Sequence, residues 1–262
     1  SASNYTMTVN VTAVNDAPTV VNDTDSVTEG GTVTETTNSA GTVISDDSDT
    51  DGDSLSVSGT VTQTSATDTS GSSITINSPN SASVGSAVTG YYGQLTLNSN
   101  GTYSYVANQS NADALDSGES ATDVFTFTVS DGTTTTSSTI TFTVNGANDA
   151  PTASDNTVTT TEDNNHTFAA SEFGFTDVDG DSLDHVTIAT LPSTGTLYLS
   201  GVAVSAGDQI SAADISNLVF TPAANGNGSP YDTFTFSVND GTTDSASNYT
   251  MTVNVTAVND AP

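Results

Sequence analysis

Apolar and small polar residues alternate with a period of two along much of this 262-residue chain, and no long stretch shows the helical period. This alternation is typical of strands that bury one face. It is clear near the C-terminal end, where Tyr249, Met251, Val253 and Val255 are separated by Thr and Asn. The same pattern predicts strands over residues 55–61, 91–97, 103–105, 125–129, 140–144, 186–188, 197–199, 202–204, 218–220, 234–238 and 249–255. Residues 32–37 are ambiguous, because Val33 is their only apolar member.

The chain repeats itself at its two ends. Residues 1–18 are identical to residues 245–262, and Asn-Asp-Ala-Pro occurs at 15–18, 148–151 and 259–262. The repeats predict a slice of a tandem array. Residues 1–18 would be the orphan terminal strand and linker of a preceding repeat, followed by domains at 19–151 and 152–262. Without its own sheet, the first strand would either fray or borrow an edge from a neighbour.

Turn residues separate the predicted strands at short intervals. Asn100-Gly101 and Ser200-Gly201 supply the positive φ angles that tight hairpin turns need. Ala112 to Asp116 allows at most one helical turn. Short strands, frequent turns and domains of 111 to 133 residues favour sandwiches over barrels. We therefore predict an all-β chain of two tandem Ig-like or cadherin-like antiparallel β-sandwiches.

Charge is the strongest constraint from composition. The chain has 31 Asp and Glu, no Lys and no Arg, which gives a formal net charge of −31. Nucleic acid and anionic lipid are therefore unfavourable partners, and cations must come from solution. The absence of Cys and Lys excludes disulfides and Lys-to-Asn isopeptide crosslinks. No apolar run approaches the length of a membrane-spanning helix, so we expect no direct membrane contact.

Carboxylates cluster at two places in the sequence. Ca²⁺ binds six to eight hard oxygen ligands, so closely spaced Asp residues with a glycine between them are candidate ligands. The alternative to a calcium site is a solvated acidic loop that binds no ion. The first stretch contains Asp46, Asp47, Asp49, Asp51 and Asp53, and the second contains Asp177, Asp179 and Asp181.

Longer motifs resemble known repeats. YYGQLTLNSNGTYSY at 91–105, LDSGE at 115–119 and FTFTVSDG at 125–132 resemble the VCBS repeat of large bacterial surface proteins. DVDGDSL at 177–183 and FTFSVNDG at 234–241 resemble the cadherin-like repeats found beside VCBS repeats in RTX-type adhesins. The resemblance implies an extracellular, calcium-binding, tandemly repeated stalk at a bacterial cell surface, as in adhesion and biofilms. The glycine-rich RTX motif itself is missing.

The cadherin resemblance also implies a ligand set at each linker. It comprises the Asn-Asp pair of the linker, an Asp-x-Asp pair and a strand-end Asp from the following domain, and an early Glu from the preceding domain. The Asp-Arg-Glu segment has no match, since the chain has no Arg. The residues at these positions are Asn15, Asp16, Glu29, Asp131, Asn148, Asp149, Glu162, Asp177, Asp179, Asp240, Asn259 and Asp260.

Other chemistry is weakly represented. His166 and His185 are the only imidazoles and cannot build a zinc site without Cys, so we expect ordinary surface histidines. No nucleophile motif is present, and we expect no enzyme. Tyr91, Tyr92, Tyr103 and Tyr105 could stack on a sugar, but core packing fits their alternation better.

The sequence is compatible with two functions. The leading hypothesis is a calcium-stiffened extender of a secreted bacterial cell-surface adhesin. Its partners would be the neighbouring repeats of the same chain, while other domains of the parent contact carbohydrate, host or biofilm surfaces. The alternative is a module that binds carbohydrate or protein directly. The duplicated terminal strand favours the extender.

Overall fold

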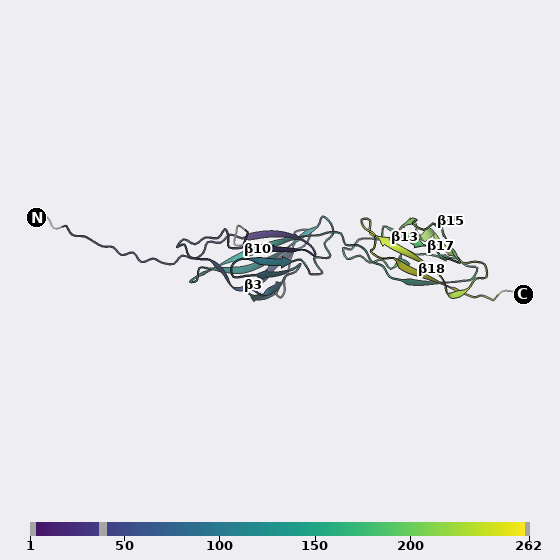
Figure 1. Ribbon diagram of the computed structural model, residues 1–262, viewed down its shortest axis with the longest axis horizontal. Helices are drawn as coiled ribbons and strands as arrows, with labels where there is room; N and C mark the ends of the chain where they lie inside the picture. Colours follow the sequence, from purple (N-terminus) through teal and green to yellow (C-terminus); the bar gives the residue numbers. More distant parts are fainter. Residues whose placement is uncertain (1–3, 37–40, 260–262) are drawn as a thin grey trace. The chain divides into compact units, whose positions relative to one another are not determined.

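The computed structural model describes residues 4–36 and 41–259, and the chain divides into two units, Ser1–Ala147 and Asn148–Pro262 (Figure 1). Each unit is an all-β sandwich with its own hydrophobic core. The prediction of tandem sandwiches is confirmed. Within the described residues, no helix is long and apolar enough to cross a membrane.

The first unit packs a six-stranded sheet against a four-stranded sheet. The larger sheet has the order β1-β10-β9-β3-β4, with β5 also paired to β3, and the smaller has the order β2-β8-β7-β6. Their bounds are β1 (Asp23–Thr28), β2 (Thr32–Glu35), β3 (Ser56–Thr67), β4 (Ser73–Ile74), β5 (Ser81–Ser83), β6 (Ala87–Thr89), β7 (Gln94–Leu97), β8 (Tyr103–Val106), β9 (Ser120–Ser130) and β10 (Thr135–Asn145).

The second unit repeats the plan with five strands against four. The sheet orders are β11-β19-β18-β13-β16 and β12-β17-β14-β15. Their bounds are β11 (Asn156–Thr161), β12 (His166–Thr167), β13 (His185–Thr190), β14 (Thr196–Leu199), β15 (Val202–Ala203), β16 (Gln209–Ser211), β17 (Leu218–Thr221), β18 (Gly228–Asn239) and β19 (Tyr249–Thr256), with short 3-10 helices η1 (Ala170–Phe173) and η2 (Ile215–Asn217).

Alternation predicted most of the long strands, because one face of each is buried. It missed the first strand of both units, since β1 and β11 each bury a single apolar residue, Val27 or Val158. These two strands pair in parallel with the last strands, β10 and β19, so both larger sheets are mixed rather than purely antiparallel. Residues 4–18 form no strand, and their side chains are exposed or half-buried, apart from the buried Pro18.

Aromatic rings fill the core of the first unit. Tyr105 stacks on Phe142 with ring centroids 4.1 Å apart and lies edge-on to Phe125. Tyr92, Tyr103 and Tyr105 are all buried, and the interpretation of these tyrosines as core residues is correct. They are not available as a sugar-stacking platform.

One buried aspartate in each unit holds a loop in place. Asp123 is fully buried on β9, and its carboxylate accepts hydrogen bonds from the backbone N–H groups of Tyr91, Tyr92 and Gly93 at 2.9–3.1 Å. The Tyr105 hydroxyl donates a fourth at 2.7 Å, and the Gln63 amide a fifth at 3.2 Å. The expected strand over 91–97 therefore begins only at Gln94.

The second unit uses Asp232 on β18 in the same way. Its carboxylate accepts the backbone N–H groups of Ser193, Thr194 and Gly195 at 2.6–3.1 Å. Each of these loops ends on a glycine, Gly93 or Gly195, where a larger residue would clash. A Cβ would lie 2.4 Å from the Tyr105 ring at Gly93 and 2.1 Å from the Phe220 ring at Gly195. Asp123 and Asp232 both stand two residues before a Phe-x-Phe pair, a signal that is visible in the sequence but that alternation and carboxylate spacing did not single out.

Removing the first of these carboxylates should destabilise its unit strongly. Asp123→Ala leaves several buried donors without an acceptor, each costing roughly 1–3 kcal/mol, so we expect a loss on the order of 3 kcal/mol or more in the free energy of unfolding. Urea denaturation followed by tyrosine fluorescence measures it. Asp113→Ala, on the turn after β8, is the matched control and should cost less than about 1 kcal/mol. Equal losses in both variants would contradict this role.

The depressed pKa of Asp232 should make the stability of the second unit depend on pH. Burial raises the pKa of Asp232, but the N–H donors of Thr194, Ser193 and Gly195 lower it further, and the net pKa lies below its usual range. Its stabilisation is therefore complete above the unfolded pKa of about 4 and is lost as pH falls through the lower folded value. Asp232→Asn should be less stable than wild type at about pH 6, with a smaller difference at about pH 2. A difference that stays constant across this range would exclude the carboxylate charge as the cause.

Candidate calcium site

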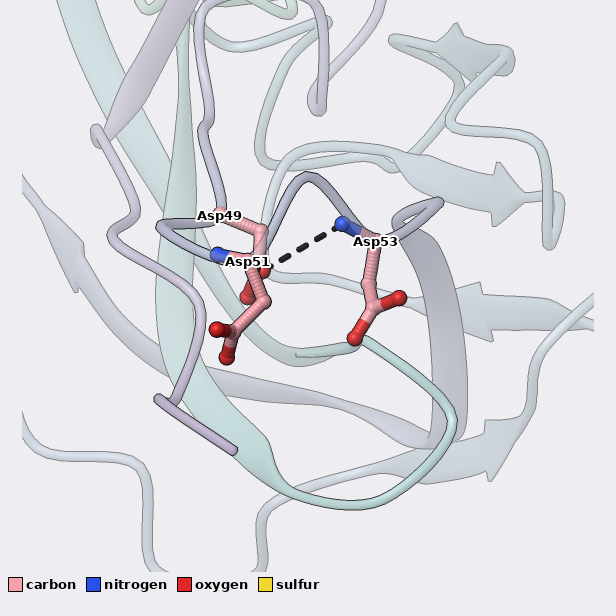
Figure 2. Close-up of side chains that lie close together, drawn as sticks. All are labelled: Asp49, Asp51 and Asp53. Carbon is pink, nitrogen blue, oxygen red and sulfur yellow. Dashed lines mark hydrogen bonds between the residues drawn. The ribbon is translucent and has the colours of Figure 1, made fainter. Parts of the chain in front are cut away.

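Three aspartates converge on one loop of the first unit. Asp49, Asp51 and Asp53 each place a carboxylate oxygen within 4.8 Å of the others (Figure 2). The Asp49 Oδ1 atom accepts the backbone N–H groups of Asp51 at 2.9 Å and Asp53 at 3.3 Å, which curls the loop. Gly52 provides the positive φ of 82° that the turn requires. The sequence spacing Asp-x-Asp-Gly-Asp is thus converted into a cluster of oxygen atoms.

The linker preceding the unit joins this cluster. The Asp16 N–H donates to Asp51 Oδ2 at 2.7 Å, and the Asn15 amide donates to Asp131 Oδ2 at 2.9 Å. Asp131 lies between β9 and β10 and also accepts the backbone N–H groups of Thr133 and Thr134 at 2.6 Å. Residues that are more than a hundred positions apart therefore meet at one end of the sandwich.

The second unit builds the same arrangement at the corresponding positions. The Asp149 N–H donates to Asp179 Oδ2 at 2.7 Å, and the Asn148 amide donates to Asp240 Oδ2 at 3.0 Å. Asp240 again accepts two backbone N–H groups, from Thr242 and Thr243, at 2.6 Å. Asp177 joins them, because its Oδ1 atom accepts the Asp179 N–H, so five of the six residues predicted for one linker site are brought together within this unit.

Asp177 shapes the acidic loop of the second unit, as Asp49 does in the first. Its Oδ1 atom accepts the backbone N–H groups of Asp179, Gly180 and Asp181 at 3.0–3.1 Å. Its Oδ2 atom is buried and makes no hydrogen bond, and the same is true of Asp49 Oδ2. A buried anionic oxygen without a donor is costly unless a cation faces it.

The residues fit a calcium ion in charge and in chemistry. Hydrogen bonds from the side chains of Thr134 and then Asn15 hold the pKa of Asp131 below its usual range. Burial raises the pKa of Asp240, but donors from Thr243 and Asn148 lower it further, so its net pKa is also depressed. Both carboxylates are therefore ionised at neutral pH. Hard oxygen ligands from carboxylates and a linker are the donor set that Ca²⁺ prefers.

The two predicted glutamates occupy equivalent places: each follows the first strand of its unit and contacts the chain where the unit ends. Glu29 follows β1 and accepts the backbone N–H of Ala147 at 2.9 Å, directly before Asn148 in the sequence. Glu162 follows β11 and accepts the backbone N–H of Val258, directly before Asn259. Each glutamate thus fixes the chain just ahead of an Asn-Asp pair. Asp260 lies outside the described residues.

The other two members of the first acidic run lie beside a residue that sequence spacing did not single out. Burial, and then the charges of Asp46 and Asp47, raise the pKa of Asp23 to about 7. Burial also raises the pKa of Asp47, although its Oδ1 atom accepts the Val21 N–H at 2.8 Å. Asp23 lies on β1, more than twenty residues before this run, so no local spacing could have linked the two. Whether Asp46 and Asp47 bind an ion stays a prediction.

The two histidines pair with neighbouring carboxylates. The His166 Nε2 atom lies 3.2 Å from Glu172 Oε2, and the His185 Nδ1 atom lies 2.8 Å from Asp184 Oδ2. Both side chains are largely buried rather than on the surface as expected, with 16% and 15% exposed. Packing of His166 edge-on to Phe168 explains part of this burial.

Comparison with family models identifies both units. Residues 15–146 match the model of the bacterial cadherin-like domain. The chain belongs to the bacterial cadherin-like domain family. Residues 148–256 match the model of the bacterial Ig domain, where the sequence motifs predicted a cadherin-like repeat. The cadherin-like match instead covers the first unit, which the motifs had likened to a VCBS repeat. Neither model describes a catalytic family, and both are typical of structural or adhesion modules outside the cell.

Solved structures that resemble this bacterial cadherin-like chain are distant from it. Human protocadherin-24 EC1-2 is 14% identical, with 91% of this chain and 95% of that chain covered and a TM-score of 0.43. The endo-fucoidan hydrolase MfFcnA4 of glycoside hydrolase family 107 is 20% identical with a TM-score of 0.31. The alignment covers 93% of this chain but only 29% of the hydrolase. No curated protein sequence matches the chain.

An isosteric change at Asp177 separates ion binding from loop shape. Asp177→Asn can keep the Oδ1 acceptor for three backbone N–H groups but replaces the unpartnered Oδ2 by an amide. We expect calcium affinity at this unit to fall by tenfold or more, about 1.4 kcal/mol, with little change in stability without calcium. Isothermal titration measures the affinity. Asp208→Asn, on an exposed turn, should leave it unchanged. Unaltered binding in Asp177→Asn would remove this residue from the ligand set.

Proposed function

We propose that the chain is a calcium-binding extender segment of a bacterial cell-surface adhesin, in which bound calcium stiffens the linkers between repeats. The observation that carries this proposal is the recurrence of one carboxylate arrangement in both units, built each time around an Asn-Asp pair of the linker. A feature repeated in every unit suits a spacer. A dedicated binder would need a special surface on one unit only.

Calcium gives the charge of the chain a function in this proposal. With no Lys or Arg anywhere in the sequence, the clustered carboxylates can be neutralised only by hydrogen-bond donors and by ions from solution. An ion that binds only the folded chain stabilises it by about 2.7 kcal/mol when free calcium is a hundredfold above the dissociation constant. Extracellular calcium would thus favour the folded, ordered state.

The linker is the element that calcium would stiffen. Glu29 accepts a hydrogen bond from the backbone of Ala147, and the next two residues are Asn148 and Asp149. Asn148 donates to Asp240 on the turn after β18, and Asp149 donates to Asp179 of the acidic loop. The short segment between these contacts leaves few free dihedral angles once an ion is bound. We include Glu29 as a proposed ligand from the preceding repeat, and Glu162 as its counterpart for the next linker.

The finer assignment follows the motifs in the sequence. We propose that the parent is an RTX-type adhesin, that the first unit is a VCBS-like variant of the cadherin-like domain, and that the protein functions at the cell surface in adhesion and biofilms. Direct carbohydrate binding is the weaker hypothesis, because Tyr92, Tyr103 and Tyr105 are buried. Other domains of the parent would contact the distal surface.

Small-angle scattering with and without chelator tests the stiffening. We expect removal of calcium to broaden the distance distribution of wild type and to lower its melting temperature. Asp149→Ala keeps the backbone N–H that bonds to Asp179 but removes a linker carboxylate, so it should resemble the chelated state even with calcium present. Asp208→Ala is the control and should behave as wild type. Unchanged dimensions and melting temperature after chelation would refute calcium stiffening.

A further inference from the structure

The first unit carries an uncharged pocket that shares no residue with the acidic loop or the linker. It has a volume of about 310 Å³ and is formed by β3, the segment after β4, the loop before β7 and the turn after β8. None of its described lining residues is an Asp or a Glu, although the chain has 31 of them. Amides dominate its polar surface and include two of the four Gln residues in the chain. These amides are Gln63, Asn77, Asn80, Gln109 and Asn111.

Hydrogen bonds fix the orientation of three of these amides. The Asn80 Nδ2 atom donates to the carbonyl at the end of β6 at 2.9 Å, and the Asn111 Nδ2 atom donates to the Tyr91 carbonyl at 3.1 Å. Gln63 is buried, and its Nε2 atom donates to Asp123 Oδ1 at 3.2 Å. An N–H group must face each of these acceptors, so the amide oxygens point the other way. Within the described residues these oxygens accept no hydrogen bond, which leaves them available to a ligand.

Tyr91 adds an aromatic ring to the pocket. Unlike the three buried tyrosines of this unit, it is only half-buried. Its ring lies edge-on to Tyr92 with centroids 5.0 Å apart, and its backbone N–H donates to the buried Asp123 at 2.9 Å. Half-buried Ile76 also lines the pocket. Apolar surface is thus combined with a few oriented polar atoms, which is typical of sites for small ligands.

We propose that this pocket binds a neutral sugar residue of a glycan. Sugar hydroxyls donate to the free amide oxygens, and the apolar face of the sugar ring packs on Tyr91. The net charge of −31 disfavours an anionic sugar. A calcium ion would find no carboxylate ligand in the pocket. The site adds a binding function to the extender and does not depend on the calcium proposal.

The corresponding loop of the second unit has a different environment. The loop that Asp232 holds borders a pocket of about 160 Å³, and no amide side chain is among its described lining residues. These residues are Leu191, Pro192, Gly195, Thr196, Leu197 and Val204. The amide-lined pocket is therefore a surface of one unit at this place in the fold, as expected of a binding site built on a shared scaffold.

Nuclear magnetic resonance of the full, isotope-labelled chain tests the proposal. The probes are glucose, galactose, mannose, N-acetylglucosamine and N-acetylgalactosamine, and neutral oligosaccharides of the same sugars, each titrated to millimolar concentration. We expect at least one of them to shift the side-chain NH₂ signals of Gln63, Asn80 and Asn111 saturably, and to leave the signals of the second unit in place. Shifts that are equal in both units would show non-specific association and overturn the proposal. No shift with any of these sugars, including the case in which calcium alone shifts the pocket signals, would also overturn it.

Variants of the lining residues test the assignment of the site. Asn77→Ala/Gln109→Ala removes two amides that hold no backbone group, so we expect binding of the sugar found above to weaken by about tenfold or more, with an unchanged melting temperature. Tyr91→Leu keeps an apolar contact with Tyr92 but removes the flat ring, and it should weaken binding by about fivefold or more. Asn165→Ala/Gln209→Ala, at two exposed amides of the second unit, is the matched control and should bind as wild type does. Binding that neither pocket variant weakens would overturn the proposal.

Discussion

The central constraint on this chain is that its carboxylates have no basic side chain of Lys or Arg to pair with. The sequence has 31 Asp and Glu residues and no Lys or Arg. The structure meets this constraint with backbone N–H groups. Asp123 and Asp232 each hold a loop inside a sandwich, and Asp49, Asp131, Asp177 and Asp240 each accept two or more backbone donors at its end. Backbone donors favour the ionised form and order the loop at the same time.

This arrangement leaves a division between satisfied and unsatisfied oxygens. One oxygen of Asp49 and one of Asp177 shape their loops, while the other oxygen of each is buried without a donor. The internal carboxylates differ, because Asp123 and Asp232 use both oxygens. The first kind keeps one oxygen without a hydrogen-bond donor, and the second has donors on both oxygens. The same residue type thus has two roles, which burial and the number of donors distinguish.

The sandwich fold makes the cluster possible. Parallel pairing of β1 with β10 and of β11 with β19 returns the start of each unit to its last strand. The acidic loop before β3 or β13 and the turn between the last two strands then meet where the linker enters the unit. Glu29 and Glu162 lie after the first strands and fix the chain where it leaves each unit.

The sequence by itself determined the fold class, most long strands, the hairpin turns and the composition of the acidic loops, because alternation and local spacing are properties of neighbouring residues. It also placed the Asn-Asp pairs and distant aspartates in one set through a family resemblance. Only the tertiary structure decided which acids meet. It paired the polar strand β1 with β10 and the polar strand β11 with β19. It placed Asp23 next to Asp46 and Asp47, and it directed the buried carboxylates of Asp123 and Asp232 at the backbone of loops. These contacts join residues far apart in sequence, and their strength depends on burial. It also showed that residues 4–14, identical to a core strand, stay exposed without a sheet, because a strand is defined by its neighbours as much as by its own sequence.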